Sequence, residues 1–220
     1  MTPSITAADA ASPSLPSIEP YIHDTVRWLE RAVIGLNLCP FAKAVHVKGQ
    51  IHYVVTLAAT TQEVLELLRE QLVELASTPA EVRDTTLLVM PRCLQDFLDF
   101  NDFLGAAEDL LHALGLEGTL QVASFHPQFQ FAGTDVDDVT NCTNRSPYPM
   151  LHLLRESSID RAVEVYPEAE AIFERNMEVL EGMGMVGWQA LDVGPHGAEG
   201  EKVAVNTVGG SGQPTQGDVL

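Results

Sequence analysis

The chain has 220 residues, of which 45% are apolar, so it is long enough to bury one substantial core. Twelve Lys and Arg residues stand against 31 Asp and Glu residues, which gives a formal net charge of −19. A field of this sign repels phosphate backbones and anionic membrane surfaces, and so argues against a protein that binds nucleic acid or a membrane surface.

The cysteines and the N-terminus indicate a cytoplasmic protein. Cys39, Cys93 and Cys142 are odd in number, far apart in sequence and form no CxxC pair, which favours a reducing compartment over a disulfide framework. No apolar run approaches the roughly 18 residues needed to cross a bilayer. The first residues lack the basic start and apolar segment of a secretory signal.

The N-terminal part of the chain predicts a disordered segment followed by a helix. Residues 1–17 are mainly Ala, Ser, Pro and Thr and cannot offset the entropy of ordering. A helix is predicted over residues 17–38 because apolar side chains recur at the helical interval, and it ends before Pro40. The apolar positions are Ile22, Val26, Leu29, Val33 and Leu36.

Three apolar, β-branched runs predict strands at residues 51–57, 85–90 and 119–125, with a helix between each pair. The first of these helices follows Thr60, which stands three residues before Glu63 in a capping-box spacing. The apolar faces of the two helices are Val64, Leu65, Leu68, Leu72 and Leu75, and Phe97, Phe100, Leu104, Ala107, Leu111 and Leu114. Asp96, Asp99 and Asp102 on the second helix are interpreted as its solvated face.

A long polar loop follows the third strand. After it, a short helix is predicted at residues 149–156, with Pro149 at a position where its missing N–H has no effect. Residues 162–166 are ambiguous between a fourth strand and irregular chain. Pro167 then opens a helix that ends at Gly182 and Gly184.

The domain limits follow from composition. The chain becomes rich in Gly, Pro, Ser and Gln near its end, so residues 193–220 are expected to form a flexible tail. The prediction is therefore a single globular domain over residues 18–192.

The alternation of strands and helices predicts an α/β domain with a parallel or mixed sheet of three to four strands covered by helices. In such sheets, ligands bind beyond the carboxyl ends of the strands. This edge would bring together Arg92, Cys93 and His126, with the loop of residues 128–147 spread over it. The arrangement requires the middle strand to run parallel to the others.

Two histidines are candidate catalytic residues. His126 lies between Phe125 and Pro127 at a strand end, where an imidazole can act as a general base or metal ligand. His152 lies on the predicted short helix and could face the same cleft. For both, the alternative is a structural histidine that bonds the loop backbone or packs in the core.

Asn144, Arg145 and Ser146 form the densest polar run and are candidate substrate-binding residues, together with Arg92. The planar guanidinium of Arg145 suits a carboxylate or phosphate, and its neighbours add donors. Such side chains also tie down main-chain carbonyls in long loops, and both interpretations remain open.

Cys39 and Cys142 are candidate nucleophiles or metal ligands. Cys39 follows a helix end, which disfavours a thiolate, whereas Cys142 lies in the polar loop. Together with His126 and His152 they could form a metal site, but the short ligand spacing of zinc motifs is missing and no metal ligand is assigned. The sequence identifies neither a cofactor nor an oligomeric state.

Three blocks of sequence carry a family resemblance: LCPFA, SFHPQFQFAG and TNRSPYPMLHLLRE. They resemble the signature blocks of a bacterial family known only as a domain of unknown function, over roughly residues 21–191. The resemblance supports the domain limits and directs attention to the polar residues already named. It implies no activity, cofactor or catalytic residue.

Three hypotheses follow. The first is a small cytoplasmic enzyme, a hydrolase or transferase, in which Arg145 and Asn144 hold a small anionic substrate while His126 moves a proton. His152 would orient His126 or substitute for it. The second is a non-catalytic ligand-binding or interaction protein whose Asn-Arg-Ser-Pro loop is a structural clamp, and the third is a metal-binding protein. The first two differ in whether His126 and Arg145 line an open cavity.

Overall fold

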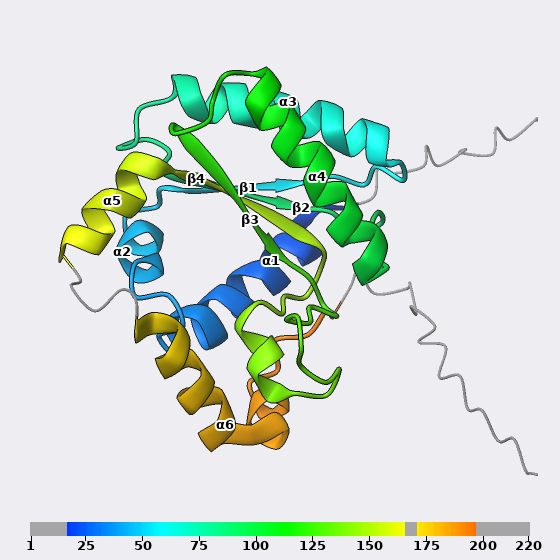
Figure 1. Cartoon of the computed structure of the whole chain (residues 1–220), viewed down its shortest axis with the longest axis vertical. Coiled ribbons are helices and arrows are strands. Elements are labelled where there is room, and N and C mark those ends of the chain that lie inside the picture. Colours follow the sequence, from blue (N-terminus) through cyan, green and yellow to red (C-terminus); the bar gives the residue numbers. More distant parts are fainter. Residues whose placement is uncertain (1–16, 166–170, 197–220) are drawn as a thin grey trace, which may run out of the picture.

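A computed structural model of the chain describes residues 17–165 and 171–196. At its centre is one four-stranded mixed sheet with strand order β1-β2-β4-β3. Helices lie on both faces of this sheet (Figure 1). The predicted α/β class with a sheet covered by helices is therefore confirmed.

The three predicted strands are present as β1 (Ile51–Val55), β2 (Thr85–Val89) and β3 (Leu120–Phe125). β1 and β2 pair in parallel, whereas β4 (Met150–Arg155) pairs antiparallel with both β2 and β3. Because β4 opposes both neighbours, β1, β2 and β3 all point the same way. Their carboxyl ends lie at one edge, here called the carboxyl edge, as the sequence predicts.

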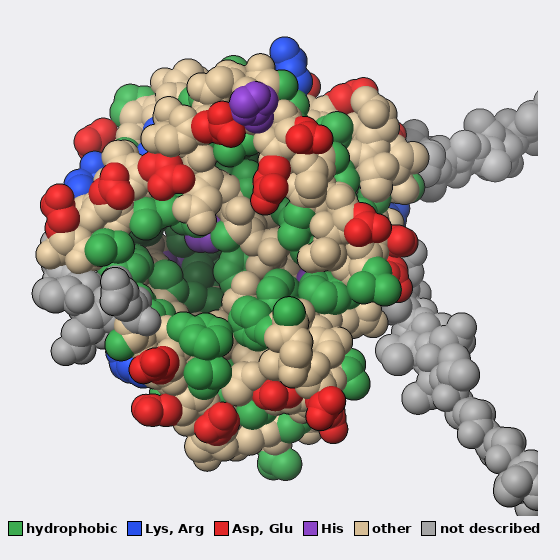
Figure 2. Space-filling view, viewed as in Figure 1, with side chains coloured by type: hydrophobic (Ala, Val, Ile, Leu, Met, Phe, Trp, Pro, Cys, Tyr) green, Lys and Arg blue, Asp and Glu red, His purple; other side chains and the backbone are tan. Residues whose placement is uncertain are grey.

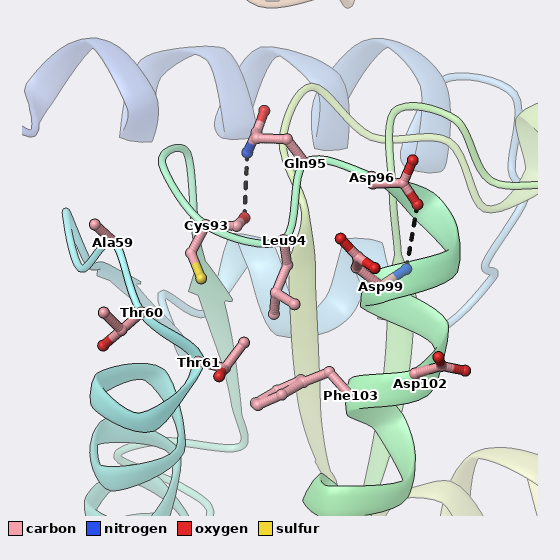
Figure 3. Close-up of a pocket in the computed structure, with 10 residues that line it drawn as sticks. All are labelled: Ala59, Thr60, Thr61, Cys93, Leu94, Gln95, Asp96, Asp99, Asp102 and Phe103. Carbon is pink, nitrogen blue, oxygen red and sulfur yellow. Dashed lines mark hydrogen bonds between the residues drawn. The ribbon is translucent and has the colours of Figure 1, made fainter.

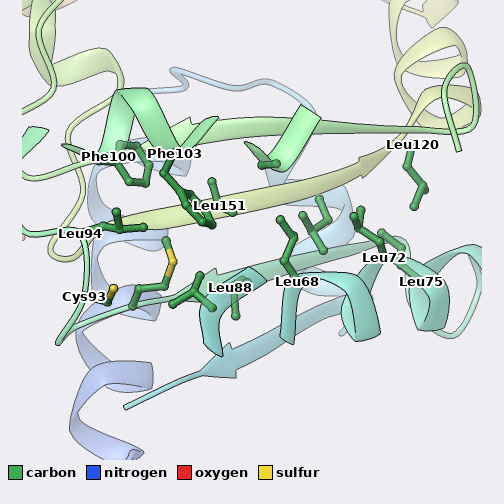
Figure 4. Close-up of a cluster of buried hydrophobic side chains, with 14 residues drawn as sticks. Leu68, Leu72, Leu75, Leu88, Cys93, Leu94, Phe100, Phe103, Leu120 and Leu151 are labelled. Atoms are coloured by element: carbon green, nitrogen blue, oxygen red, sulfur yellow. The ribbon is translucent and has the colours of Figure 1, made fainter. Parts of the chain in front are cut away.

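The first face of the sheet is covered by α3 (Thr61–Ser77) and α4 (Phe97–Ala113) (Figure 4). Thr60 and Glu63 form the predicted capping box at the start of α3. The Asp96 carboxylate accepts hydrogen bonds from two backbone N–H groups at the start of α4. Side chains with no exposed surface fill the space between helices and sheet: Val64, Leu68, Leu72, Leu75, Leu88, Phe100, Leu151 and Leu153.

The second face is covered unevenly. α1 (Glu19–Trp28) continues into a π-helical turn, η1 (Leu29–Ile34), and α2 (Ala42–Val47) follows. The α1–η1 helix packs closely on Val89 and Met150 near the carboxyl edge. Farther along the same face, side chains of the strands keep accessible surface: Ile51, Tyr53, Ala123, His152 and Leu154.

Two predictions for the segment after the polar loop are wrong. The predicted helix at residues 149–156 is strand β4, and the candidate strand at residues 162–166 belongs, as far as Val165, to helix α5 (Glu156–Val165). Met-Leu-His-Leu-Leu is rich in helix formers, but β4 is a central strand with neighbours on both sides. A strand in that position reads as a continuous apolar run.

The remaining helices complete the fold. The loop contains a 3-10 turn, η2 (Val139–Thr143), which packs against α6 (Ile172–Ala190). Gly184 adopts a positive φ of 67° and interrupts α6 at the position where the sequence predicts its end. None of the described helices is long and apolar enough to cross a membrane.

Residues 193–196, which the sequence assigns to the tail, are held against α1. Val193 is buried, and the Arg27 guanidinium donates to the carbonyls of Asp192 and Gly194 at 2.8 and 2.7 Å. The predictions for residues 1–16, for Pro167 and for the tail beyond residue 196 lie outside the described residues.

Candidate functional site

His126 is fully buried at the end of β3, and both of its ring nitrogens are hydrogen-bonded to the backbone. Nε2 lies 3.1 Å from the carbonyl oxygen of Leu94, and Nδ1 accepts from the backbone N–H of Gln128 at 3.0 Å. This pattern defines a neutral imidazole with its proton on Nε2. Burial lowers the pKa of His126, which keeps the ring in that form.

Arg145 is likewise bonded to the backbone. Its Nε donates to the carbonyl of Phe129 at 3.2 Å, and a terminal guanidinium nitrogen donates to the carbonyl of Val136 at 2.6 Å. The Asn144 side chain donates to the carbonyl of Ser124, and the Ser146 hydroxyl donates to the carbonyl of Tyr148. The whole Asn-Arg-Ser run thus ties main-chain segments together.

A further hub of this loop is Asn141, which is fully buried. Its amide oxygen accepts from the Phe131 backbone and the Thr134 hydroxyl, and its amide nitrogen donates to the carbonyl of Asp135. We call residues 126–147, with these bonds, the clamp loop. This geometry agrees with the structural interpretation of the loop, in which its polar side chains bond to main-chain groups.

The other candidate residues are dispersed. Arg92 is exposed just beyond β2, Cys39 packs beside the α1–η1 helix, and Cys142 is buried between η2 and α6. Burial raises the pKa of both thiols, so they are protonated at neutral pH. Within residues 17–165 and 171–196, no three His, Cys, Asp or Glu side chains are grouped to hold a metal ion.

An open groove of about 730 Å³ lies at the carboxyl edge. Figure 3 shows the start of α3 and one side of α4 as its two walls, with the loop from Cys93 to Asp96 between them. Asp96, Asp99 and Asp102 line it, so these carboxylates face a concave surface as well as solvent. No Lys or Arg is among the described lining residues, and the two helix N-termini are already capped. The groove is therefore poorly suited to an anion.

A second concave surface lies on the second face of the sheet. In the view shared by Figures 1 and 2, an opening leads to the sheet between α2, α5, α6 and the α1 layer. Its visible lining is mostly apolar, with histidine atoms inside it (Figure 2). Several strand residues on this face keep accessible surface: Ile51, Tyr53, Val55, Gln121, Ala123, Phe125, His152 and Leu154. We call this space the hollow.

His152 differs from His126 in having no hydrogen-bond partner among the described residues. It lies on central strand β4 between Leu87 of β2 and Ala123 of β3, and its ring centroid is 6.1 Å from that of Phe125. Burial lowers its pKa to about 4, yet the side chain keeps accessible surface. An imidazole that is surrounded by protein and still accessible to solvent lies deep in a concave surface.

A family model described as "Protein of unknown function (DUF1415)" matches residues 20–190. The chain belongs to this family. No curated protein and no solved structure matches it.

Across the DUF1415 region, the structure separates residues that the sequence places in one site. His126 and the Asn-Arg-Ser run are in the clamp loop, whereas His152 lies on the sheet and faces the hollow. The acidic lining of the groove and the hub role of Asn141 are not expected from the sequence. The one available signal for the hollow is a polar residue, His152, in the middle of an apolar run.

Proposed function

We propose that this protein binds a small, mainly apolar molecule in the hollow, and that the clamp loop is a structural element. The observation that carries the proposal is His152, a neutral imidazole with accessible surface, no described hydrogen-bond partner and apolar neighbours on both sides. An apolar concave surface with a few polar groups is the usual form of a small-molecule site. This proposal keeps the hypothesis of a non-catalytic ligand-binding protein, but it places the ligand on the sheet and not at the polar loop.

The clamp-loop geometry argues against the enzyme hypothesis. A hydrolase or transferase acting on an anion would need Arg145 and His126 to leave the carbonyls of Phe129, Val136 and Leu94. Each departure would leave a polar main-chain group without its partner. The acidic lining of the groove would also repel an anionic substrate at the carboxyl edge.

The proposal retains a cytoplasmic location without nucleic-acid or membrane partners. All three cysteines are unpaired thiols, which suits a reducing compartment. The net charge of −19 opposes association with phosphate backbones and anionic lipid surfaces.

The test is a titration of the full ¹⁵N-labelled chain with uncharged aromatic probes such as indole and ethylbenzene. Binding in the hollow should shift the His152 imidazole resonances and the backbone amides of β4. Ala123→Leu adds a larger side chain next to His152 and should abolish these shifts.

Val122→Leu, on the opposite face of the same strand, is the matched control and should leave them unchanged. Shifts confined to Thr60, Cys93 and Asp96 would place the site in the carboxyl-edge groove instead. The absence of saturable shifts with every probe would refute a ligand site in the hollow.

A further inference from the structure

The strands present no charged side chain to the hollow. Residues alternate between the two faces, so the second face is set by the register of the four strands. Its strand residues are Ile51, Tyr53, Val55, Thr85, Leu87, Val89, Gln121, Ala123, Phe125, Met150, His152 and Leu154. A ligand that lies on this face would therefore meet no guanidinium, ammonium or carboxylate from the sheet.

Two ionic side chains of η1 are bonded to groups outside the sheet. Glu30 of η1 pairs with His46 of α2 at 3.1 Å, and Arg31 pairs with Asp192 at 3.2 Å. Figure 2 shows mainly green, hydrophobic atoms inside the opening. A charged ligand would lose its hydration on this face without gaining a counter-ion from the strands.

The imidazole of His152 needs a polar partner even though its surroundings are apolar. A neutral imidazole has one N–H donor and one acceptor nitrogen. Tyr53, in the same row across the sheet, does not serve this need. The Tyr53 hydroxyl is buried and has no hydrogen-bond partner within residues 17–165 and 171–196. It also lies two strands away from His152, about 10 Å by strand spacing.

The space for a ligand lies beside Ala123. Of the two cross-strand neighbours of His152, Leu87 is large and almost fully buried, whereas Ala123 is small and keeps accessible surface. The ring of Phe125 lies on the same side, with its centroid 6.1 Å from that of His152. A flat apolar group placed there would pack against Phe125 and bring a polar substituent to the imidazole.

We infer that the ligand is an uncharged alcohol or phenol whose apolar part packs over Ala123 and whose hydroxyl hydrogen-bonds to His152. A hydroxyl both donates and accepts, so it can pair with either ring nitrogen, whichever tautomer is present. This inference rests on the proposed function, since it names the ligand class of the same site.

The experiment compares three probes of one shape with the full chain at about pH 7.5, where a phenol is neutral and a benzoate ionised. Ethylbenzene has no polar group, 4-ethylphenol adds a hydroxyl, and 4-ethylbenzoate adds a charge. Dissociation constants come from amide shifts in β4. We expect 4-ethylphenol to bind about tenfold more tightly than ethylbenzene, the value of one net hydrogen bond, and 4-ethylbenzoate to bind most weakly.

Two variants assign the preference to one side chain. His152→Phe keeps a ring but removes both nitrogens, so it should equalise the affinities for 4-ethylphenol and ethylbenzene. Tyr53→Phe removes a hydroxyl from the same row and should keep the tenfold preference. If His152→Phe does not fold, the imidazole ¹⁵N shifts of the wild-type chain decide, because 4-ethylphenol should move them and ethylbenzene should leave them nearly unchanged.

The outcomes separate the two proposals. Equal affinities for 4-ethylphenol and ethylbenzene, both lost in Ala123→Leu, would overturn the ligand class and leave the hollow as an apolar site. Tightest binding of 4-ethylbenzoate would also overturn it and indicate an anion site. Failure of all three probes to shift β4 would overturn the proposed function itself.

Discussion

His126→Phe distinguishes a structural clamp from a catalytic loop. The imidazole is fully buried between the rings of Phe97 and Phe100, with centroid distances of 5.4 and 5.0 Å. A phenyl ring is close to it in size and shape, so the apolar packing is largely kept. What is lost is the pair of hydrogen bonds to the Leu94 carbonyl and the Gln128 N–H.

The expected loss of stability comes from these two main-chain groups. A buried group left without its partner costs about 1–3 kcal/mol. Leu94 is only 8% exposed, so the cost for its carbonyl lies near the upper end of this range. Gln128 is exposed, so its N–H can bond to water instead and costs little. We expect the free energy of unfolding to fall by roughly 3 kcal/mol. For a chain of this length, that lowers Tm by about 6–12 °C.

Urea unfolding followed by far-ultraviolet circular dichroism measures this change. His112→Gln is the control, because the His112 side chain is 74% exposed and its replacement should change stability by less than about 0.5 kcal/mol. A His126→Phe variant as stable as the wild type that no longer binds or turns over a ligand would refute the clamp. The catalytic role predicted from the sequence would then regain support.

Three further predictions test other parts of the structure. Arg145→Ala removes two charged donors from main-chain carbonyls and should lower the free energy of unfolding by about 2 kcal/mol. Arg69→Ala, on the exposed side of α3, is the control and should change it by less than about 0.5 kcal/mol in the same urea titration. Thr85→Val should lower the free energy of unfolding by about 1 kcal/mol, because the Thr85 hydroxyl donates to the Leu153 carbonyl at 2.6 Å. Thr86→Val should raise it by a similar amount, because the buried Thr86 hydroxyl has no partner in the described part of the chain. Changes of the same sign for both variants in thermal melts would contradict this. Burial lowers the pKa of His152 from 6.5 to about 4, so the unfolded chain binds a proton at a higher pH than the folded chain does. The free energy of unfolding should therefore fall by up to about 3 kcal/mol as the pH drops from 6.5 to 4. His152→Leu should lose less stability over that range, and an unchanged pH profile in this variant would argue against the buried neutral ring.

The elements predicted correctly are those in which local pattern and tertiary environment agree. β1, β2 and β3 are β-branched or apolar runs bounded by turn signals, and α3 begins with a capping box that forms as predicted. The common direction of these strands follows from helices that connect them in sequence. The carboxyl edge of the sheet is therefore predictable from the sequence alone.

The errors lie where pairing partners decide the structure. β4 consists of helix-forming residues, and only its place between β2 and β3 makes it a strand. Conversely, residues 162–165, which the sequence leaves ambiguous between a strand and irregular chain, continue helix α5. Because the sequence predicts a helix around His152, it does not predict which face of the sheet this residue occupies, its neighbours or its exposure.

The clamp loop shows why a dense polar run is ambiguous evidence for a site. A long segment with little regular structure leaves many main-chain groups without partners, and buried ones must be bonded by side chains. Asn141, Asn144 and Arg145 meet that demand, which explains their density without a ligand. A polar residue inside an apolar strand has no such structural explanation. His152 is therefore the stronger indication of function, although it stands alone in its run and the loop residues stand together.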